Sequence, residues 1–446
     1  MLEKQKWIHF ENDILTEWRQ LKDEGRPVDK FEEVCIELSK QNRSKEKTNN
    51  ANEIWNKMSY SSVDKEYPYI EPSDLDGIIK ERPAKRHSFD KSLSEKQLRD
   101  KLTGAWLGRI SGCLLGKPVE GYLRERLTNL LRGTDNYPMS RYITKEQFTD
   151  ELIKECKINT GSCWADNING IAPVDDDTNY TVFTLKLIQY FGKNFRPNDV
   201  LEAWLGWMPM LTTFTAERVA YRNAAAGMLA PETASYKNPY REWIGAQIRG
   251  DFFGYINITD TEKAAEMAWR DASISHIKNG IYGEMFVAAM ISAAAVCDNV
   301  QTIIESGLDE IPKKSRLRKA IDHVIQSYNE GQKYQKVIDH IHSLYNEAKE
   351  HGWCHTIPNA MIVTAALLFG EKDLGKSICL AVEAAFDTDC NGATVGSIIG
   401  IMVGAKNIPD YWSEPYKNNL ETSISGFTKV SVSDLVKYTI DIIKSE

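Results

Sequence analysis

Two groups of aspartates are the residues of this sequence whose types and spacing point most directly to chemistry. Asp387 and Asp389 stand two positions apart, and residues 175–177 are three consecutive aspartates. Each group has a structural explanation, because carboxylates cap helix N-termini and favour the positive end of the helix dipole. Together, however, they place five carboxylates at expected helix starts in a mostly apolar region. Five anions cannot gather there without compensating positive charge.

Divalent cations are the expected compensation, because no Lys or Arg stands beside either aspartate group in the sequence. A site made of carboxylate oxygens favours Mg²⁺, Ca²⁺ or Mn²⁺ over zinc. The eight cysteines include no Cys-x-x-Cys pair, so neither a structural zinc site nor a disulfide framework is expected.

Two segments with glycine at every fourth position are expected to hold these acids in place. The glycines of the two ladders are Gly104, Gly108, Gly112 and Gly116, then Gly392, Gly396, Gly400 and Gly404. Each interior glycine costs a helix ~0.5–1 kcal/mol relative to alanine, so four on one ridge need a packing reason. Because glycine lacks a Cβ, we expect the two ladders to face each other, or a shared third helix, in the core.

The fold class expected from the rest of the chain is all-α. Ser94 and Gln97 fit a capping box that opens the helix carrying the first ladder, and Pro118 ends that helix. Strand signals are weak, and no phosphate-binding loop is found. We expect one multi-helix domain over residues 96–446 and a helical N-terminal extension over residues 1–95. Within the extension, residues 41–50 are expected to form an exposed loop and residues 54–85 to be irregular.

Composition limits the function classes. With 446 residues, 42% of them hydrophobic, the chain can bury a sizeable core. A formal net charge of −8 and the absence of a long basic run disfavour direct nucleic-acid binding. The N-terminus lacks the apolar segment of a signal peptide, and no apolar run reaches the ~18 residues that span a bilayer. A cytoplasmic protein without membrane contact is expected.

The motifs and their order resemble the ADP-ribosylglycohydrolase family, which includes the dinitrogenase reductase-activating glycohydrolases and the ADP-ribosyl-acceptor hydrolases. The resemblance covers about residues 98–405. Its motifs are Gly104-Ala105-Trp106-Leu107-Gly108, Gly116-Lys117-Pro118-Val119-Glu120, Asp176-Asp177-Thr178, Ser275-His276 and Asp387-Thr388-Asp389. It implies an all-α fold, two metal ions, usually Mg²⁺, at the base of a cleft, and hydrolysis of the bond between the ADP-ribose C1″ atom and an acceptor.

The resemblance also implies roles for individual residues. Glu120 falls on an acid that lies over the cleft in some members, so it is the candidate for proton transfer; an exposed loop acid is the alternative. The implied catalytic residues are Glu120, Asp177 and Asp387. The implied metal ligands are Asp175, Asp176, Asp177, Asp387, Asp389 and Cys390, and the ions are Mg²⁺, with Mn²⁺ or Ca²⁺ as alternatives.

A second set of residues is assigned to the substrate. His276 matches the family's Thr/Ser-His pair, although a satisfied buried histidine is the alternative. Tyr282 and Phe386 could stack on adenine or ribose, or simply pack in the core. The candidate substrate-binding residues are His276, Asn279, Gly280, Tyr282 and Phe386. His355 and Asn359 could line the cleft or serve the start of a helix.

Three positions depart from the family's pattern. Asp175 and Cys390 stand where many members have Thr or Ser, and Cys113 stands where Asp is usual. Since a thiol is a poor ligand for Mg²⁺, one metal would be bound with an extra carboxylate in place of hydroxyls, or with altered affinity. The departures leave the metal and the cleaved linkage open.

The function expected from the sequence is hydrolysis of ADP-ribose from an acceptor, which is an ADP-ribosylated protein or a small-molecule ADP-ribosyl conjugate. Two alternatives remain. One is a non-catalytic ADP-ribose binder, such as an immunity-type protein, and the other is a hydrolase of a different ribosyl conjugate.

Overall fold

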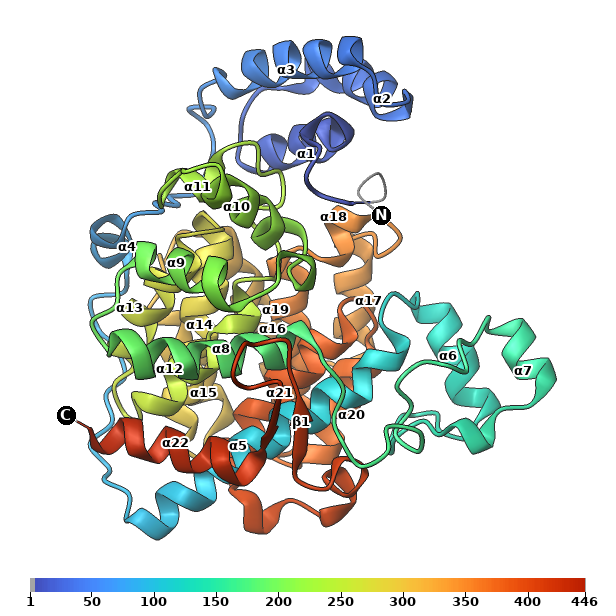
Figure 1. Ribbon diagram of the computed structural model, residues 1–446, viewed down its shortest axis with the longest axis vertical. Coiled ribbons are helices and arrows are strands. Elements are labelled where there is room, and N and C mark those ends of the chain that lie inside the picture. Colours follow the sequence, from blue (N-terminus) through green and yellow to red (C-terminus); the bar gives the residue numbers. More distant parts are fainter. Residues whose placement is uncertain (1–4, 446) are drawn as a thin grey trace.

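The computed structural model describes residues 5–445, and within that range the regular secondary structure is almost entirely helical (Figure 1). The helices are α1 (Ile14–Asp23), α2 (Glu32–Lys40), α3 (Lys45–Ser59), α4 (Leu75–Glu81), α5 (Glu95–Gly116), α6 (Arg124–Gly133), α7 (Asp150–Glu155), α8 (Asp176–Phe191), α9 (Pro197–Trp207), α10 (Thr215–Ala225), α11 (Glu232–Ser235), α12 (Asp251–Ile256), α13 (Thr261–Ala272), α14 (Lys278–Ala294), α15 (Val300–Leu308), α16 (Arg316–Asn329), α17 (Tyr334–Leu344), α18 (Glu350–Trp353), α19 (Thr356–Phe369), α20 (Leu374–Glu383), α21 (Thr388–Val403) and α22 (Val432–Lys444). Strands β1 (Asn419–Glu421) and β2 (Lys429–Ser431) form one antiparallel pair, with Leu420 opposite Val430. The expected all-α fold class is confirmed.

The two glycine ladders form the central contact of the fold, between α5 and α21. A Cβ added to Gly112 would lie 1.9 Å from the Gly392 carbonyl oxygen, and one added to Gly108 would lie 2.0 Å from that of Gly396. Both distances are far below van der Waals contact, so only glycine fits. The expectation that the ladders face each other is confirmed. Because the helices run antiparallel, the end of α5 lies beside the start of α21.

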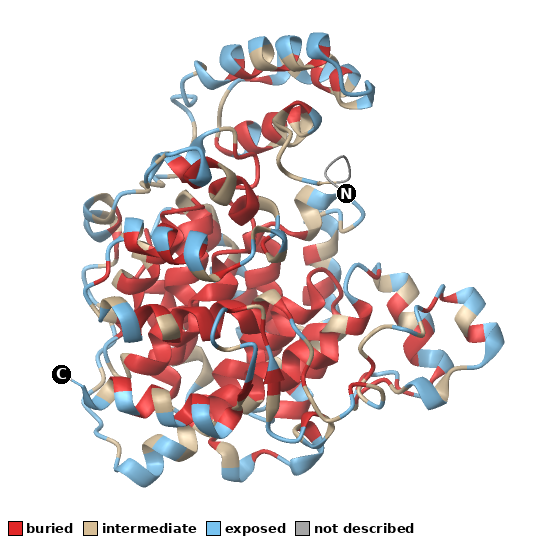
Figure 2. Cartoon of the chain, viewed as in Figure 1, coloured by how far each residue is buried: buried red, intermediate tan, exposed pale blue. Residues whose placement is uncertain are grey.

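Buried helices surround this pair. Figure 2 shows the buried residues concentrated in the body of the molecule, and every described residue of α19 from Thr356 to Leu368 is buried. The α14 helix is buried from Asn279 to Ala294, so it presents apolar side chains in all directions, as a helix enclosed by other helices must. In residues 5–445, no helix has the length and apolar character needed to cross a bilayer.

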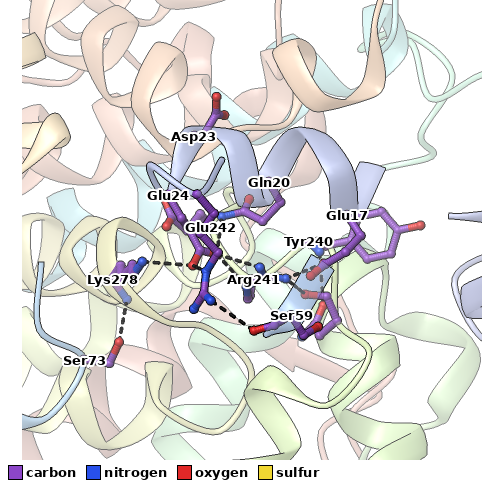
Figure 3. Close-up of polar contacts among 12 residues, drawn as sticks. Glu17, Gln20, Asp23, Glu24, Ser59, Ser73, Tyr240, Arg241, Glu242 and Lys278 are labelled. Carbon is purple, nitrogen blue, oxygen red and sulfur yellow. Dashed lines mark hydrogen bonds and ion pairs between the residues drawn. The ribbon is translucent and has the colours of Figure 1, made fainter. Parts of the chain in front are cut away.

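The first three helices form a separate small layer, which lies beyond α10 and α11 in Figure 1. They share their own hydrophobic cluster, with Trp18, Leu38, Trp55 and Met58 among its buried members. The layer docks on the body through α1, as Figure 3 shows. Arg241 of the body is buried between two acids of the extension, 2.5 Å from Glu17 and 2.6 Å from Glu24.

Two expectations for the extension were wrong. Residues 41–50 are not a loop throughout, because α3 begins at Lys45, and residues 54–85 contain the end of α3 and the whole of α4. The reason is local capping by two residues. The Ser44 side chain accepts a hydrogen bond from the Lys47 N–H, and the Asp74 side chain accepts one from the Gly77 N–H. These caps satisfy backbone donors at the helix starts and allow helices with few apolar residues.

Candidate metal centre and hydrolase site

A cavity of about 430 Å³ opens where α5 ends and where α8 and α21 begin. The acids that line it are Glu120, Asp175, Asp176, Glu217, Glu350, Asp387 and Asp389. Large aromatic side chains line it as well. A cavity with both charged and apolar lining suits a ligand that has both polar and flat apolar parts.

The structure brings the two aspartate groups together, although about 210 residues separate them in the sequence. One ligand atom each from Asp177, Asp389 and Cys390 lie within 4.8 Å of one another, and the same holds for Glu120, Asp387 and Asp389. The convergence follows from the glycine contact. A Cβ on Gly116 would lie 2.2 Å from the Thr388 carbonyl oxygen, so the chain just after α5 is pressed against the first turn of α21.

Two cations that the sequence analysis did not assign to the site lie among these acids, although neither stands beside an aspartate group in the sequence. Lys117 places its Nζ atom 2.6 Å from Asp175 Oδ2. Arg109 is fully buried, with guanidinium nitrogens 3.1 Å from Asp177 Oδ1 and 3.0 Å from Asp251 Oδ2. Both belong to the helix facing α21 or to its end, so proximity in the sequence could not reveal them. A signal was present at Arg109, because an arginine in a core helix needs a carboxylate partner.

These two cations do not balance the site. Burial first, and then the neighbouring carboxylates, raise the pKa of Asp177 and of Asp387 well above the usual range. The pKa of Asp389 rises to about 6, again mainly through burial. The Asp389 charge, followed by burial, raises the pKa of Glu120 well above its ordinary value. For Asp175 alone, Lys117 outweighs the effect of burial and the pKa falls.

Further positive charge therefore fits this site, and two side-chain atoms show where. Asp177 Oδ2 and Asp389 Oδ1 are buried and have no hydrogen-bond partner among the described residues. Such orphaned carboxylate oxygens are costly unless a cation binds them. Oxygens of this kind are the ligands that Mg²⁺, Mn²⁺ and Ca²⁺ prefer.

The remaining metal-ligand candidates differ in how available they are. Asp176 and Asp387 line the cavity. Asp175 uses both oxygens within the protein, one for Lys117 and one for the Asp177 N–H at 2.9 Å. Burial and the aspartate charges raise the pKa of the Cys390 and Cys113 thiols well above the usual value. Protonated thiols do not bind hard cations.

The five candidate substrate-binding residues lie elsewhere. None of His276, Asn279, Gly280, Tyr282 and Phe386 is among the described residues that line the cavity. The segment from Lys278 onward is helical, so its side chains are used in packing: Asn279 bonds to Glu71, and the Tyr282 hydroxyl donates to the Pro72 carbonyl. His276 is buried and its Nδ1 atom pairs with Ser275 Oγ at 2.8 Å. Phe386 packs edge-on against His342. Their roles in substrate binding thus remain predictions without a cavity contact.

Asn359 and His355 serve helix starts, the alternative that the sequence left open. Asn359 Oδ1 accepts hydrogen bonds from the Asp387 N–H at 3.2 Å and from Asn391 Nδ2 at 2.8 Å. It therefore holds the first turn of α21. The His355 side chain accepts a hydrogen bond from the Ile357 N–H and caps α19.

The aromatic wall was not foreseen. Trp7, Phe214, Trp243 and Trp353 line the cavity. Trp7 belongs to the extension and contacts Phe214 edge-on, with ring centroids 5.8 Å apart. Arg222 of α10 donates a hydrogen bond to the Ile8 carbonyl at 3.1 Å, which fixes the N-terminal segment against the body. Nothing in the sequence pattern linked Trp7 to aspartates almost 400 residues away.

Comparison with known proteins identifies the family of the chain. The sequence profile of the family described as ADP-ribosylglycohydrolase matches residues 94–439, and the chain belongs to that family. A solved structure described as an ADP-ribosylglycohydrolase-related protein complex is 18% identical, covers 78% of this chain and 99% of its own, and superposes with a TM-score of 0.49. No curated protein matches the sequence. The protein is therefore a glycohydrolase of a metal-dependent family that acts on ADP-ribosylated substrates.

Proposed function

We propose that this protein is a Mg²⁺-dependent hydrolase that cleaves the glycosidic bond between ADP-ribose and an acceptor. The acceptor is a protein side chain or, as a second candidate, a small molecule. The observation that carries the proposal is the pair of orphaned, buried oxygens on Asp177 and Asp389. Asp389 lines a cavity large enough for part of a nucleotide, and Asp177 lies directly behind it, within ligand distance of Asp389. Mn²⁺ and Ca²⁺ are alternative ions for the same oxygens.

The chain's own residues divide the work. Asp177 and Asp389 would hold the cation, which supplies positive charge that orients ribose hydroxyls and a water molecule. Glu120 is close to Asp387 and Asp389, and it transfers a proton between the water and the departing acceptor. As the bond to C1″ breaks, the ribose gains oxocarbenium character, which the carboxylate of Asp387 stabilises.

The aromatic wall completes the assignment. A flat adenine or ribose face can pack against Trp7, Phe214 or Trp353, which line the same cavity as the acids. Phe214 is 41% exposed although it is a large apolar residue. Together with Trp7 and Trp353 it gives the cavity a set of large apolar residues beside the acids, and apolar surface bordered by polar groups is typical of ligand-binding grooves.

The direct test is release of free ADP-ribose from an ADP-ribosylated arginine protein in the presence of Mg²⁺, with a panel of other linkages in parallel. Asp177→Asn and Asp389→Asn should each lower the rate at least ~100-fold, because each removes a ligand oxygen charge. Asp441→Asn is the matched control, since Asp441 is exposed on α22. Inactivity of the wild-type protein on every linkage would refute the proposal.

The thiols of Cys113 and Cys390 and the Lys117–Asp175 ion pair also favour a second candidate, which is a protein that binds ADP-ribose without turnover. Calorimetry separates the two. Binding of ADP-ribose with no release from any conjugate, including other N- and O-ribosides, would support the binder. Turnover of a riboside other than an ADP-ribosyl conjugate would instead reassign the substrate of the same site.

A further inference from the structure

We propose that Lys117 is a built-in cation of the metal centre and that this chain consequently binds one divalent ion, not the two that the family resemblance implies. The inference rests on the metal site of the proposed function and deepens it. The single ion lies at the oxygens of Asp177 and Asp389, and the Lys117 ammonium neutralises Asp175.

The position of Lys117 is fixed by the backbone. It directly follows Gly116, which packs against the Thr388 carbonyl without room for a Cβ. Its side chain is 22% exposed and that of Asp175 is 1% exposed, with 2.6 Å between Nζ and Oδ2. An ion pair this close and this enclosed is not a surface contact that solvent exchanges freely.

The ligands near Asp175 are already used. One ligand atom each from Cys113, Asp175 and Asp177 lie within 4.8 Å of one another, which makes this corner a candidate ion position by distance. Its chemistry argues otherwise. Both Asp175 oxygens already accept a hydrogen bond, from Lys117 and from the Asp177 N–H, and a thiol is a poor ligand for a hard cation. Within this group, Asp177 Oδ2 is the one carboxylate oxygen without a partner, and a single oxygen does not make a Mg²⁺ site. Asp176, which lines the cavity, is not part of the group.

The group around Asp177 and Asp389 has the pair of unpartnered oxygens that the group around Asp175 lacks. Asp177 is fully buried and Asp389 is 3% exposed. Each has an oxygen without a hydrogen-bond partner, and ligand atoms of the two side chains lie within 4.8 Å of each other. Asp387 and Glu120 stand next to Asp389 and can add further oxygens. The orphaned oxygens therefore indicate one ion position, and the buried ion pair marks the other as filled.

Charge repulsion adds to the argument. A divalent ion placed at Asp175 would lie within a few ångströms of the Lys117 ammonium and near the Arg109 guanidinium, which pairs with Asp177. Like charges at that separation repel strongly in a buried site, where water screens little. A second ion could enter only by displacing Lys117 from Asp175.

Metal counting tests the inference without any substrate. We expect wild-type protein titrated with Mn²⁺ to bind one ion per chain by calorimetry and elemental analysis, with an EPR spectrum free of Mn–Mn coupling. Lys117→Met removes the ammonium at similar length, and the double variant Lys117→Met with Cys113→Asp also supplies a hard ligand. The double variant should bind two ions and show the coupled spectrum, whereas Lys117→Arg, which keeps the charge, should bind one.

Each outcome bears on the inference. Two ions on the wild-type chain, or a double variant that folds and still binds one ion, would overturn it. Loss of the wild-type ion in Asp177→Asn identifies the counted ion as the one in the centre, and its persistence would overturn the assignment. Should Lys117→Met fail to fold, as judged by circular dichroism, the wild-type count and the Lys117→Arg count still decide. One bound ion with no hydrolase activity would refute the proposed function and leave this inference standing.

Discussion

Two contacts hold the site together, one made by glycine backbone and the other by buried charged side chains. Between α5 and α21 the closest approach is made by backbone, since glycines of both helices meet there. Between α1 and the body, the contact is made by buried charges, with Arg241 held by Glu17 and Glu24, and Lys278 2.9 Å from Glu24 (Figure 3).

The first contact keeps a fixed geometry, whereas the strength of the second depends on the charges of its side chains. Backbone packed on backbone has no rotamers to change, so the acids at the start of α21 keep one position relative to the end of α5. A buried ion pair depends on every charge having its partner and on the protonation state of its acids. The proposed metal ligand Asp389 thus lies on the backbone contact, and the aromatic residue Trp7 is positioned through the charged one.

The largest effect is expected from a methyl group in the glycine contact. Gly112→Ala would place a Cβ 1.9 Å from the Gly392 carbonyl oxygen, so two buried helices would have to separate. The free energy of unfolding should fall by more than the ~1–3 kcal/mol typical of overpacking, and the variant should lose metal binding. Thermal unfolding and Mn²⁺ calorimetry measure the two quantities.

The matched control for that variant is Gly206→Ala. Gly206 lies in α9, and no atom stands within 4 Å of its added Cβ. Alanine there should raise stability by ~0.5–1 kcal/mol through helix propensity. If Gly112→Ala were as stable as this control, the two helices would not be locked by their glycines.

The second-largest effect is expected from removing the charge of Arg241 at the contact between α1 and the body. Arg241→Met leaves Glu17 and Glu24 buried without their shared partner, which typically costs ~3–5 kcal/mol. The extension should then detach before the body unfolds, and limited proteolysis should release it. The control Arg196→Met removes an arginine whose side chain is 79% exposed and should change stability by less than ~1 kcal/mol. Equal proteolysis of both variants would mean that the extension docks by its apolar contacts alone.

The charged contact should also respond to pH, with a smaller effect because one proton is involved. Burial, only partly offset by Arg241, raises the pKa of Glu17 from 4.5 to about 7 in the folded protein. Between these two values the folded state holds the proton and the unfolded state has lost it, so stability falls as pH rises from about 4.5 to about 7. Urea unfolding of the wild-type protein and of Glu17→Gln, compared at pH values across this window, should show that the variant lacks this part of the decline. Parallel curves would contradict it.

The smallest effect expected is on ligand affinity. Trp7→Ala removes one aromatic wall residue, and aromatic contacts contribute ~0.5–1.5 kcal/mol beyond buried area. The Kd for ADP-ribose should therefore rise about three- to tenfold by calorimetry, with metal affinity unchanged. Tyr60→Ala, at a side chain 87% exposed in the same extension, should leave both constants unchanged. An unaltered Kd in Trp7→Ala would show that the wall does not touch the ligand.

The sequence predicted the parts of the site whose reason is local. A four-residue glycine repeat has few explanations other than close helix packing, and acids at helix starts follow from capping rules, so the ladders and the convergence of Asp177 with Asp389 could be foreseen. The start of α3 could also have been found, because Ser44 is a recognisable N-cap. Its polar character concealed it, since periodicity searches follow apolar residues.

What the sequence could not predict depends on which surfaces face each other. Lys117 and Arg109 stand on α5 or its end, whereas the acids that they neutralise belong to α8, and only the packed structure shows this pairing. Trp7 reaches the cavity because α1 is docked by Arg241, about 230 residues away along the chain. The segment from Asn279 to Tyr282 lies away from the cavity for the opposite reason. Its residue types suit ligand binding, but their side chains hold a buried helix in place.

The antiparallel course of α5 and α21 has a mechanical consequence for the chemistry. If either helix slid along the other, the segment bearing Glu120 and the one bearing Asp389 would travel in opposing directions, and their spacing would change by the full displacement. Carbonyl groups of each helix pack against glycine positions of the other and prevent this sliding. The glycines are Gly108 and Gly112 on α5 and Gly392 and Gly396 on α21. The separation between the segments that carry Glu120 and Asp389, the proposed proton donor and metal ligand, is thereby set by main-chain contacts, and thermal motion of the side chains changes it little.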